Sequence, residues 1–379
     1  DGHPTDELVR KLRSIMNLKG PIILHAITKK GKGYKYSEAA PSDFHGSCPF
    51  DKDSGEKPEI FTKRDSYTRA FSEKIMELAE KNKKVVAVSA SMLAGTGLDK
   101  FAQKFPDRIF DVGIAEAHAV TFAGALACGG FKPFVAIYST FLQRAYDEII
   151  HDVCLQNLGV VLCVDRAGIV GEDGATHNGI FDIAYLRHIP NMILAAPKDA
   201  NELKDMMELA LVTNKPFGIR YPKGGQLFGL AGNMPQSKLE IGKSEVLRDG
   251  KHLVIMALGS MVSVSLRAAE ILDKAGIHAV VVNARFVKPL DGELIEEMSK
   301  KFKKFVTVEE GIVSGGFGSA VLEFIDRENI KGIELKAIGL PDEFIEHGKR
   351  EELMRKYNLT PEGIANLVAN EMFERQLQW

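Results

Sequence analysis

The chain has 379 residues, a length that at roughly 150 residues per domain predicts two or three domains. Hydrophobic residues make up 45% of it, and 49 Lys and Arg nearly balance 51 Asp and Glu. This composition is typical of a globular protein and excludes disordered or collagen-like chains. The net charge of −2 argues against nucleic-acid binding through a general positive field, although a local anion pocket stays possible.

No apolar stretch reaches the roughly 18 residues that a membrane span requires, so no membrane association is expected. The four cysteines are Cys48, Cys128, Cys154 and Cys163. They form no C-x-x-C pair, and three of the four lie in apolar runs. This pattern favours buried thiols in a reducing cytoplasm over disulfides or a zinc site. The chain begins at Asp1 without a signal sequence, which suggests a processed or cut chain.

Along the chain, short β-branched runs alternate with amphipathic segments from about residue 83 onward. This alternation is typical of βαβ units and predicts an α/β fold with a mostly parallel sheet. Five strands are expected first, at Val85–Ser89, Pro133–Tyr138, Val160–Asp165, Met192–Ala195 and Phe217–Tyr221. The helices expected among them are Ala115–Cys128, Ala145–Leu155 and Asn201–Leu211.

A turn-rich stretch at 224–242 interrupts the pattern and predicts a domain boundary. A second βα series follows, with strands at His252–Leu258, Ala279–Asn283 and Phe305–Glu309 and helices at Ser265–Ala275 and Leu294–Lys300. Before residue 60 only one helix, Thr5–Asn17, and one strand, Pro21–Ala26, are expected. These two elements cannot bury a core, so the segment resembles the tail of another domain.

Glu116 lies at the start of an apolar helix, in the sequence DVGIAEAHAVTFAGALACGG. A carboxylate there interacts favourably with the positive end of the helix dipole, and this role alone is a sufficient explanation. Its small, apolar neighbours also predict partial burial, and a buried carboxyl can share a proton with a nitrogen base.

The segment after the third strand, DRAGIVGEDGATHNG, places Arg166, Asp173 and His177 in a glycine-rich loop. Open α/β sheets bind ligands at the carboxyl ends of their strands, which is where this loop lies. A histidine in a solvated loop is the plain alternative for His177.

Further candidates follow other strands. Tyr138, Phe141 and Arg144 lie in YSTFLQRAYDE, and Arg220 ends the fifth strand. An aromatic ring with several arginines can bind a flat ring and an anion, because guanidinium pairs bidentately with phosphate or carboxylate. Surface ion pairs explain each arginine equally well when it is taken alone.

Seven motifs in order carry a family resemblance: TKKGKGY, FHG, FDVGIAEAHAVTFAGALA, YSTFLQRAYDEIIHDV, VDRAGIVGEDGATHNGIFD, RYPKG and LPDEFIEHG. Together they resemble the 1-deoxy-D-xylulose-5-phosphate synthase family, thiamine-diphosphate enzymes similar to transketolase. The resemblance implies two consecutive, open, mostly parallel sheet domains, preceded by the tail of a third α/β domain. Residues 1–58 then form the tail of the diphosphate-binding domain and a linker, 59–235 the pyrimidine-binding domain and 236–379 the C-terminal domain.

The implied reaction condenses pyruvate with D-glyceraldehyde 3-phosphate to 1-deoxy-D-xylulose 5-phosphate and CO₂, a precursor for isoprenoids and for thiamine biosynthesis. Thiamine diphosphate is the implied cofactor, with Mg²⁺. The G-D-G…N motif that binds the metal and diphosphate in the family is absent from this sequence, so no metal ligand is assigned and the chain is expected to supply part of an active site.

The resemblance also implies residue roles. Glu116 corresponds to the glutamate that hydrogen-bonds the pyrimidine ring, and Phe141 to the aromatic side chain stacked on it. Lys30 and Tyr34 correspond to positions near the cofactor, and His45 and His177 to active-site histidines.

For the aldehyde, the resemblance implies two groups of residues. Arg166 and Arg220 correspond to phosphate anchors, and the remaining positions of the acceptor site are Tyr138, Arg144 and Asp173. The family is dimeric, and the apolar character of helix Ala115–Cys128 around its circumference also predicts a homodimer.

Other interpretations remain open at this stage. A split transketolase or the β-type subunit of a 2-oxo acid dehydrogenase pairs the same two domains. For the synthase, a separate N-terminal fragment that contains the G-D-G…N motif would complete the active site. A non-catalytic assembly module that has kept only the fold is the third possibility.

Overall fold

The computed structural model describes residues 1–41, 43–45, 47, 49–57, 67–225 and 237–374. The chain divides into two compact units, Asp1–Arg64 and Asp65–Trp379, and each is described by itself. Cys48 and the boundary expected at 235/236 fall outside the described residues.

The first unit contains helices α1 (Thr5–Ile15) and α2 (Lys35–Ala39). The strand expected at Pro21–Ala26 is wrong, because these residues form no regular structure. A strand needs a neighbouring backbone to accept its hydrogen bonds, and the described part of this unit contains no other strand. The side chain of Ile23 is accordingly 95% exposed.

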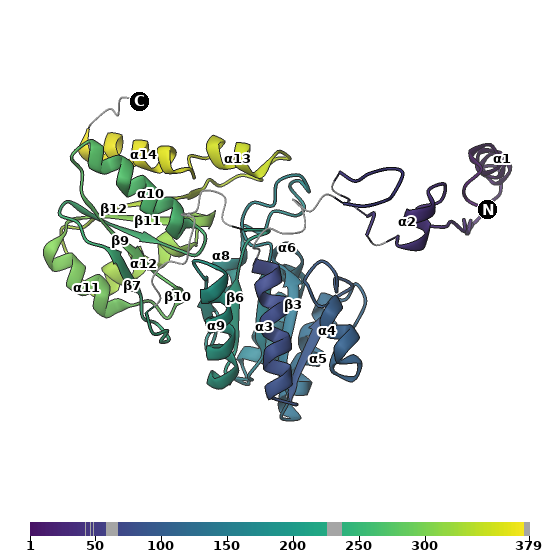
Figure 1. Cartoon of the computed structure of the whole chain (residues 1–379), viewed down its shortest axis with the longest axis horizontal. Helices are drawn as coiled ribbons and strands as arrows, with labels where there is room; N and C mark the ends of the chain where they lie inside the picture. The colour runs from purple at the N-terminus through teal and green to yellow at the C-terminus, as the bar shows by residue number, and fades with distance from the viewer. Residues whose placement is uncertain (42, 46, 48, 58–66, 226–236, 375–379) are drawn as a thin grey trace. The chain divides into compact units, whose positions relative to one another are not determined.

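The second unit begins with a seven-stranded sheet in the order β10-β5-β6-β4-β3-β1-β2 (Figure 1). Its strands are parallel except β10, which pairs antiparallel with β5. The strand bounds are β1 Val85–Ser89, β2 Ile109–Asp111, β3 Lys132–Tyr138, β4 Val161–Asp165, β5 Ile193–Ala195, β6 Phe217–Arg220 and β10 Phe286–Lys288.

Helices cover both faces of this sheet. Alternate residues of each strand point to opposite faces, so Phe134 and Cys163 pack under α3 and α9, whereas Val135 and Leu162 pack under α5 and η4. The helices of this part are α3 Tyr67–Lys81, α4 Asp99–Lys104, η2 Pro106–Arg108, α5 Glu116–Cys128, α6 Ser139–Leu142, η3 Gln143–Ala145, α7 Tyr146–Glu148, η4 Ile149–Cys154, α8 Asp182–Leu186 and α9 Ala200–Thr213.

The second sheet has five strands in the order β12-β11-β8-β9-β7, parallel except for β7. Helices α10 and α14 pack on one face and α11 and α12 on the other. The bounds are β7 Glu245–Arg248, β8 Leu253–Ala257, α10 Met261–Lys274, β9 Ala279–Asn283, α11 Gly292–Lys301, β11 Lys304–Ile312, α12 Phe317–Arg327, β12 Glu334–Leu340, α13 Arg350–Lys356 and α14 Pro361–Phe373.

The fold class expected from the sequence is confirmed: two consecutive, mostly parallel α/β sheets. The strands expected in the second unit match within one or two residues, except that the strand expected at Phe305–Glu309 extends from Lys304 to Ile312. The helix expected over Ala145–Leu155 is instead a short α turn followed by the π-helix η4. The edge strands β2, β7, β10 and β12 were not predicted. The first three have only three or four residues and carry too little periodicity, whereas β12 has seven residues and was missed despite its length.

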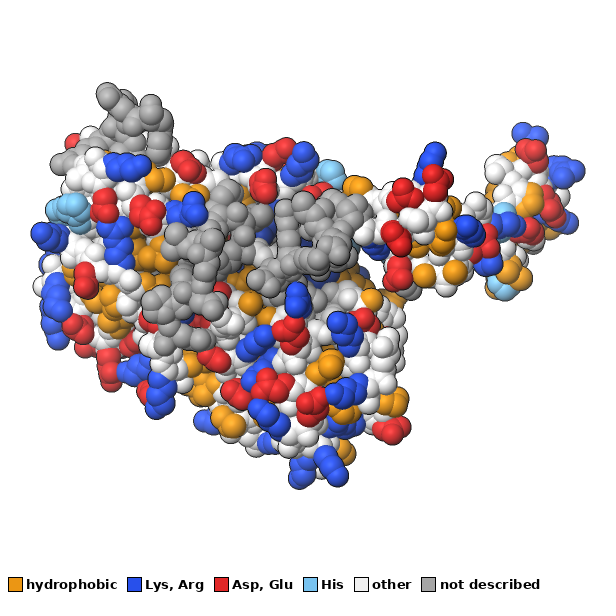
Figure 2. All heavy atoms as spheres, viewed as in Figure 1, with side chains coloured by type: hydrophobic (Ala, Val, Ile, Leu, Met, Phe, Trp, Pro, Cys, Tyr) orange, Lys and Arg blue, Asp and Glu red, His pale blue; other side chains and the backbone are white. Residues whose placement is uncertain are grey.

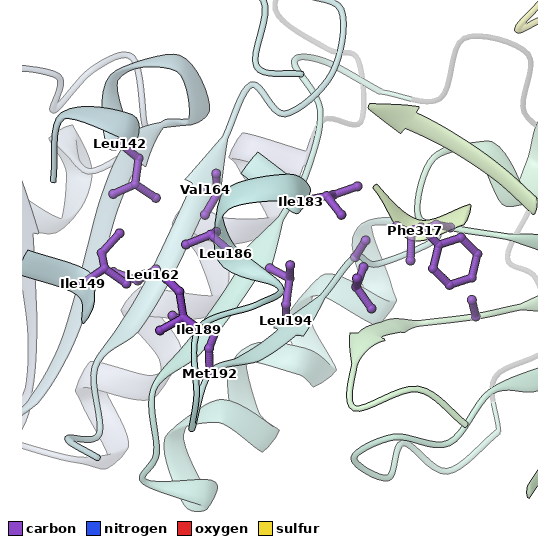
Figure 3. Close-up of a cluster of buried hydrophobic side chains, with 14 of the residues drawn as sticks. Leu142, Ile149, Leu162, Val164, Ile183, Leu186, Ile189, Met192, Leu194 and Phe317 are labelled. Carbon is purple, nitrogen blue, oxygen red and sulfur yellow. The ribbon is translucent and has the colours of Figure 1, made fainter. Parts of the chain in front are cut away.

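The two sheets share one hydrophobic core. Figure 3 shows Phe317, the first residue of α12, close to Ile183 of α8, and the same cluster continues to Leu194 and Leu162 of the first sheet. Because β10 comes from the second βα series yet completes the first sheet, the two sheets cannot move apart as separate domains without breaking a strand pair.

A cluster of buried charges also joins the sheets. Lys198 and Glu202, at the start of α9, meet Glu245 of β7 and Arg285, and all four are at most 8% exposed. Lys198 Nζ lies 2.8 Å from Glu245 Oε2, and Arg285 Nε lies 2.8 Å from Glu202 Oε1. The Asn283 side-chain amide donates to Glu202 Oε1 at 2.9 Å. Two positive and two negative groups therefore neutralise each other away from water.

Replacing Glu202 with Ala should lower the free energy of unfolding by about 3–5 kcal/mol, because it leaves an uncompensated positive charge in the interior. Glu297→Ala is the matched control: its ion pair with Lys301 is exposed, and its loss should cost less than about 1 kcal/mol. Urea denaturation of both variants measures the difference. Equal losses would show that the buried cluster contributes nothing special.

Glu309 is a second buried carboxyl, fully enclosed near the end of β11. Its two oxygens accept from the backbone N–H groups of Phe317 and Gly318, at 2.8 and 2.9 Å, in the first turn of α12. Burial raises the pKa of Glu309 to about 7, and these two donors oppose the rise. The folded protein therefore keeps this proton at a pH where the unfolded chain has released it.

The consequence is a pH-dependent loss of stability. Because the pKa of Glu309 is raised from 4.5 to about 7, unfolding releases a proton between these values and stability falls as pH rises through that window, by up to about 3 kcal/mol. Glu309→Gln should remove this contribution. The difference in unfolding free energy between wild type and variant, followed from pH 4 to 8, is the measurement; a pH-independent difference would contradict the assignment.

Figure 2 shows positive and negative side chains interspersed over the visible face, without a large patch of one sign. Among the described helices, none combines the length and apolar character needed to cross a bilayer.

Candidate active site

The candidate residues form two sets, one in each unit. In the first unit, Lys30, Tyr34 and His45 line one hollow of about 360 Å³, together with Phe44 and Phe50. The Tyr34 hydroxyl donates to the carbonyl of Lys52 at 2.9 Å, which fixes the ring. Desolvation raises the pKa of Tyr34, so its hydroxyl stays protonated at neutral pH. The sequence motifs TKKGKGY and FHG thus contribute to the same cavity wall.

In the second unit, the candidates other than Glu116 lie at or after the carboxyl ends of three adjacent strands, and Glu116 follows β2 at the edge of the same sheet. Strands β6, β4 and β3 are neighbours, and Tyr138 at the end of β3 lies opposite Asp165 at the end of β4. Parallel strands bring their carboxyl ends to one edge, so residues far apart in sequence meet there.

Glu116 is the first residue of α5, and its side chain is only 5% exposed. Its Oε1 lies 2.8 Å from Arg144 NH1, and the Arg144 side chain is 56% exposed. Arg144 was expected to bind substrate, and in the structure its guanidinium pairs with the Glu116 carboxylate. The expected burial of Glu116 is observed.

An aromatic path connects this pair to the loop residue His177. The guanidinium of Arg144 lies 5.2 Å from the ring centre of Phe141. Phe141 stacks on Tyr138 with ring centres 5.8 Å apart and meets His177 edge to face at 5.4 Å. Glu116, Arg144, Phe141 and His177 therefore form one contiguous wall.

Arg166 has an unusual backbone. Its φ angle is 57°, in the left-handed region, which costs a non-glycine residue roughly 1–3 kcal/mol. Asp165 compensates: its Oδ1 accepts from the Arg166 N–H at 2.7 Å, and its Oδ2 lies 2.9 Å from Arg166 NH1. The guanidinium also lies 3.9 Å from the ring centre of Tyr138. Arg166 is therefore clamped between a carboxylate and an aromatic face.

Burial has a large effect on the ionisable groups around this clamp. It raises the pKa of Tyr138 to about 12. It also raises the pKa of Asp165, although Arg166 and the hydroxyl of Thr68 oppose the rise. For Asp173, partial burial is outweighed by the hydrogen bond and charge of Lys223, 2.8 Å away, and the pKa is lowered. Asp173 is thus an anion at neutral pH.

Arg220 differs from the expectation of a phosphate anchor. Its side chain is 4% exposed, its Nε pairs with Asp182 Oδ2 at 2.8 Å, and its NH2 donates to the carbonyl of Glu310 at 2.9 Å. Burial and these two partners direct the guanidinium into the contact between the sheets, so these donors are not presented to a ligand.

Several site residues were not predicted from the sequence. Asp165 holds Arg166, and the Thr68 hydroxyl donates to Asp165 Oδ2 at 3.2 Å. Thr140 donates to the carbonyl of Thr176 at 2.9 Å, and Glu310 accepts from the loop. Asp165 was detectable in principle, because a carboxylate directly before an arginine at a strand end is unusual in an otherwise apolar strand. A hollow of about 600 Å³ between α9 and 237–239 contains none of the candidates.

The two buried cysteines are as expected, but Cys128 is exposed, because it ends α5 on the side away from the core. Three large apolar side chains near α5 and η4 are also exposed: Ile114 at 79%, Leu155 at 71% and Phe131 at 41%.

Comparisons with known proteins agree with this architecture. The sequence profile of the transketolase pyrimidine-binding domain matches residues 64–225, and that of the transketolase C-terminal domain matches 242–364. A solved structure titled "Split gene transketolase, inactive beta4 tetramer" is 32% identical, with a TM-score of 0.73, and the match covers 82% of this chain and 99% of that one. The chain belongs to the transketolase family.

A transketolase from Campylobacter jejuni, at 18% identity and a TM-score of 0.66, shares the fold over 86% of this chain. Among curated relatives of this family member, 1-deoxy-D-xylulose-5-phosphate synthase of Syntrophus aciditrophicus is 52% identical over 98% of the chain. The synthase of Halothermothrix orenii is 49% identical over 99%. The chain spans 57% and 59% of the lengths of these two relatives.

Proposed function

We propose that this chain is the pyrimidine-binding and C-terminal part of a 1-deoxy-D-xylulose-5-phosphate synthase. In this proposal it helps to condense pyruvate with D-glyceraldehyde 3-phosphate, releasing CO₂, in the cytoplasm. One observation carries the proposal: a buried glutamate at the start of α5 is connected through Arg144 and Phe141 to His177, in a chain 52% identical to such a synthase.

The residues of the second unit fit the pyrimidine half of thiamine diphosphate. When bound, this cofactor supplies an electron sink beside the carbonyl carbon of a 2-oxo acid. Glu116 is suited to hold a proton against a ring nitrogen, because it is a nearly enclosed carboxyl with one described charged partner. Phe141 offers an aromatic face beside it.

The diphosphate and Mg²⁺ belong, in this proposal, to the G-D-G…N motif of the diphosphate-binding domain. Among the described residues, no group of three His, Cys, Asp or Glu side chains is arranged to hold a metal ion. Lys30, Tyr34 and His45 of the first unit are proposed cofactor-binding residues, and they share one hollow within that unit.

Arg166 and His177 are proposed to receive the aldehyde. The clamp by Asp165 and Tyr138 orients the Arg166 guanidinium, a good partner for a phosphate. His177 has its Nδ1 3.0 Å from the hydroxyl of Thr176, which leaves Nε2 for a substrate oxygen. Asp173 adds an acceptor for sugar hydroxyls, whereas Arg220 pairs with Asp182 and the Glu310 carbonyl.

Glu116→Gln should reduce turnover by about 10²–10⁴-fold, because an amide cannot take up and return the proton. The assay is CO₂ release from pyruvate and aldehyde by this chain assembled with a diphosphate-binding domain. Glu293→Gln is the matched control, a glutamate in the first turn of α11 whose side chain is 87% exposed. Turnover unchanged by Glu116→Gln would overturn the assigned role.

A homodimer is also proposed, supported by the exposed apolar side chains beside α5. Light scattering of the chain should give at least twice its mass of 41.7 kDa. Leu155→Asp should weaken the association, because it would bury a charge, whereas Val212→Asp, at a side chain 76% exposed on α9, should not. A monomer at all concentrations would contradict the dimer.

A split transketolase is the second candidate. The solved split-gene transketolase favours it, because the match to this protein covers 99% of that solved chain. Product analysis decides between the two. The synthase releases CO₂ from pyruvate, whereas a transketolase transfers a two-carbon unit between sugars without decarboxylation.

A further inference from the structure

The loop that carries His177 is held from behind by the second sheet. This loop, residues 166–179, closes at its base, where Gly168 and Gly179 exchange two backbone hydrogen bonds of 2.6 and 2.9 Å. Behind the tip, Ile169 and Val170 are buried, at 0% and 2% exposure. The loop therefore has a mostly exposed tip, residues 172–176, and a buried part, Ile169 and Val170, which we call its root.

Glu310, at the end of β11, makes the central contact to this root. Its Oε1 accepts the backbone N–H of Ile169 at 3.0 Å, and its Oε2 accepts the hydroxyl of Ser260 at 2.8 Å. Both oxygens also receive Arg350 NH2 at 2.8 Å. The carboxylate is 1% exposed, so the loop amide and Arg350 are the groups that satisfy its charge.

Two glycines show how close this contact is. A Cβ at Gly168 would lie 2.6 Å from the Glu310 carboxyl carbon, and a Cβ at Gly171 would lie 2.9 Å from the Arg350 backbone nitrogen. Both glycines have φ of +91°, which few other residues tolerate. The absence of a side chain at Gly168 and Gly171 therefore allows the loop backbone to lie directly against Glu310 and Arg350.

Asn178, next to His177, provides a second and independent connection. It is 4% exposed, its Oδ1 accepts from the Val170 N–H at 2.9 Å, and its Nδ2 donates to the carbonyl of Ile345 at 3.0 Å. Ile345 belongs to the motif LPDEFIEHG, for which no role was assigned above. The two ends of the loop are therefore each fixed by a different segment of the C-terminal part.

We propose that Glu310, with Arg350 and Asn178, is a positioning residue: it fixes the root of the 166–179 loop and thereby sets where Asp173 and His177 stand for the acceptor aldehyde. The inference rests on the proposed function. It gives the C-terminal part a specific role, because Glu310, Arg350 and the carbonyl of Ile345 hold the loop without touching substrate.

The first test measures the loop itself, by hydrogen exchange followed by mass spectrometry on the 379-residue chain. Glu310→Gln should raise exchange in the peptides of 166–180 by about tenfold, because Gln presents one N–H₂ where two donors converge. Peptides of β1 and β3 should not change. Glu334→Gln is the control, an exposed ion pair with Lys304 on the same sheet.

The second test separates positioning from general destabilisation, in the assembled enzyme. Glu310→Gln should raise KM for D-glyceraldehyde 3-phosphate by about tenfold and change KM for pyruvate less than twofold. Asn178→Ala should reproduce this split through its own contact, so the proposal does not depend on one variant folding well. Loss of active protein alone would lower kcat and leave both KM values unchanged.

Unchanged exchange in the loop, or equal shifts of both KM values, would overturn the inference. The proposed function fails in a different way: the wild-type assembly would then release no CO₂ from pyruvate and aldehyde, while the exchange experiment would still report on the loop.

Discussion

The candidate site depends on the compensation of charges buried between the two sheets. Glu310 is satisfied by Arg350 and by the amide of Ile169, and Lys198 and Arg285 are satisfied by Glu202 and Glu245. A charge that lost its partner there would be far more costly than one at the surface. The strand β10, the shared core around Phe317 and these ion pairs all oppose separation of the sheets. The edge on which the site is built is consequently rigid.

Rigidity at this edge makes a strained backbone possible. Arg166 stays in the left-handed region because Asp165 binds both its amide and its guanidinium, while Tyr138 covers one face. Asp165 in turn is fully buried at the end of a central strand, so water cannot replace Arg166 as its hydrogen-bond partner. The result is a guanidinium held in one orientation by Asp165 and Tyr138.

The sequence predicted the fold well wherever the strands are central. Strands such as Val85–Ser89 and Ala279–Asn283 are apolar throughout because helices cover both faces, so composition alone defines their ends. The prediction missed the edge strands. Strand β10, for example, forms because it pairs with β5, and the residues Phe286–Lys288 contain no local pattern that indicates this pairing. The prediction of a strand at Pro21–Ala26 was wrong for the opposite reason. The segment is apolar, but the described part of its unit contains no strand with which it could pair.

The site was predictable to the extent that its residues lie in recognisable motifs. Glu116, Phe141 and His177 lie along one series of contacts that runs through Arg144, in segments that follow β2, β3 and β4. Arg220 shows the limit: its motif suggested an anion site, whereas its partners Asp182 and the Glu310 carbonyl come from segments 38 and 90 residues away. A long-range partner of this kind leaves no local pattern.

The same reasoning explains why the second sheet matters to a site that lies on the first. A glycine-rich loop such as 166–179 gains little stability from its own contacts, since glycine loses more backbone entropy on folding than other residues do. Its order must come from a surface that recognises its backbone. Glu310 and the carbonyl of Ile345 supply that surface at opposite ends of the loop, through hydrogen bonds to the Ile169 amide and the Asn178 side chain. A loop held at its root by another sheet can keep glycine at its tip, where a ligand must approach the backbone closely, and still present a histidine in one place.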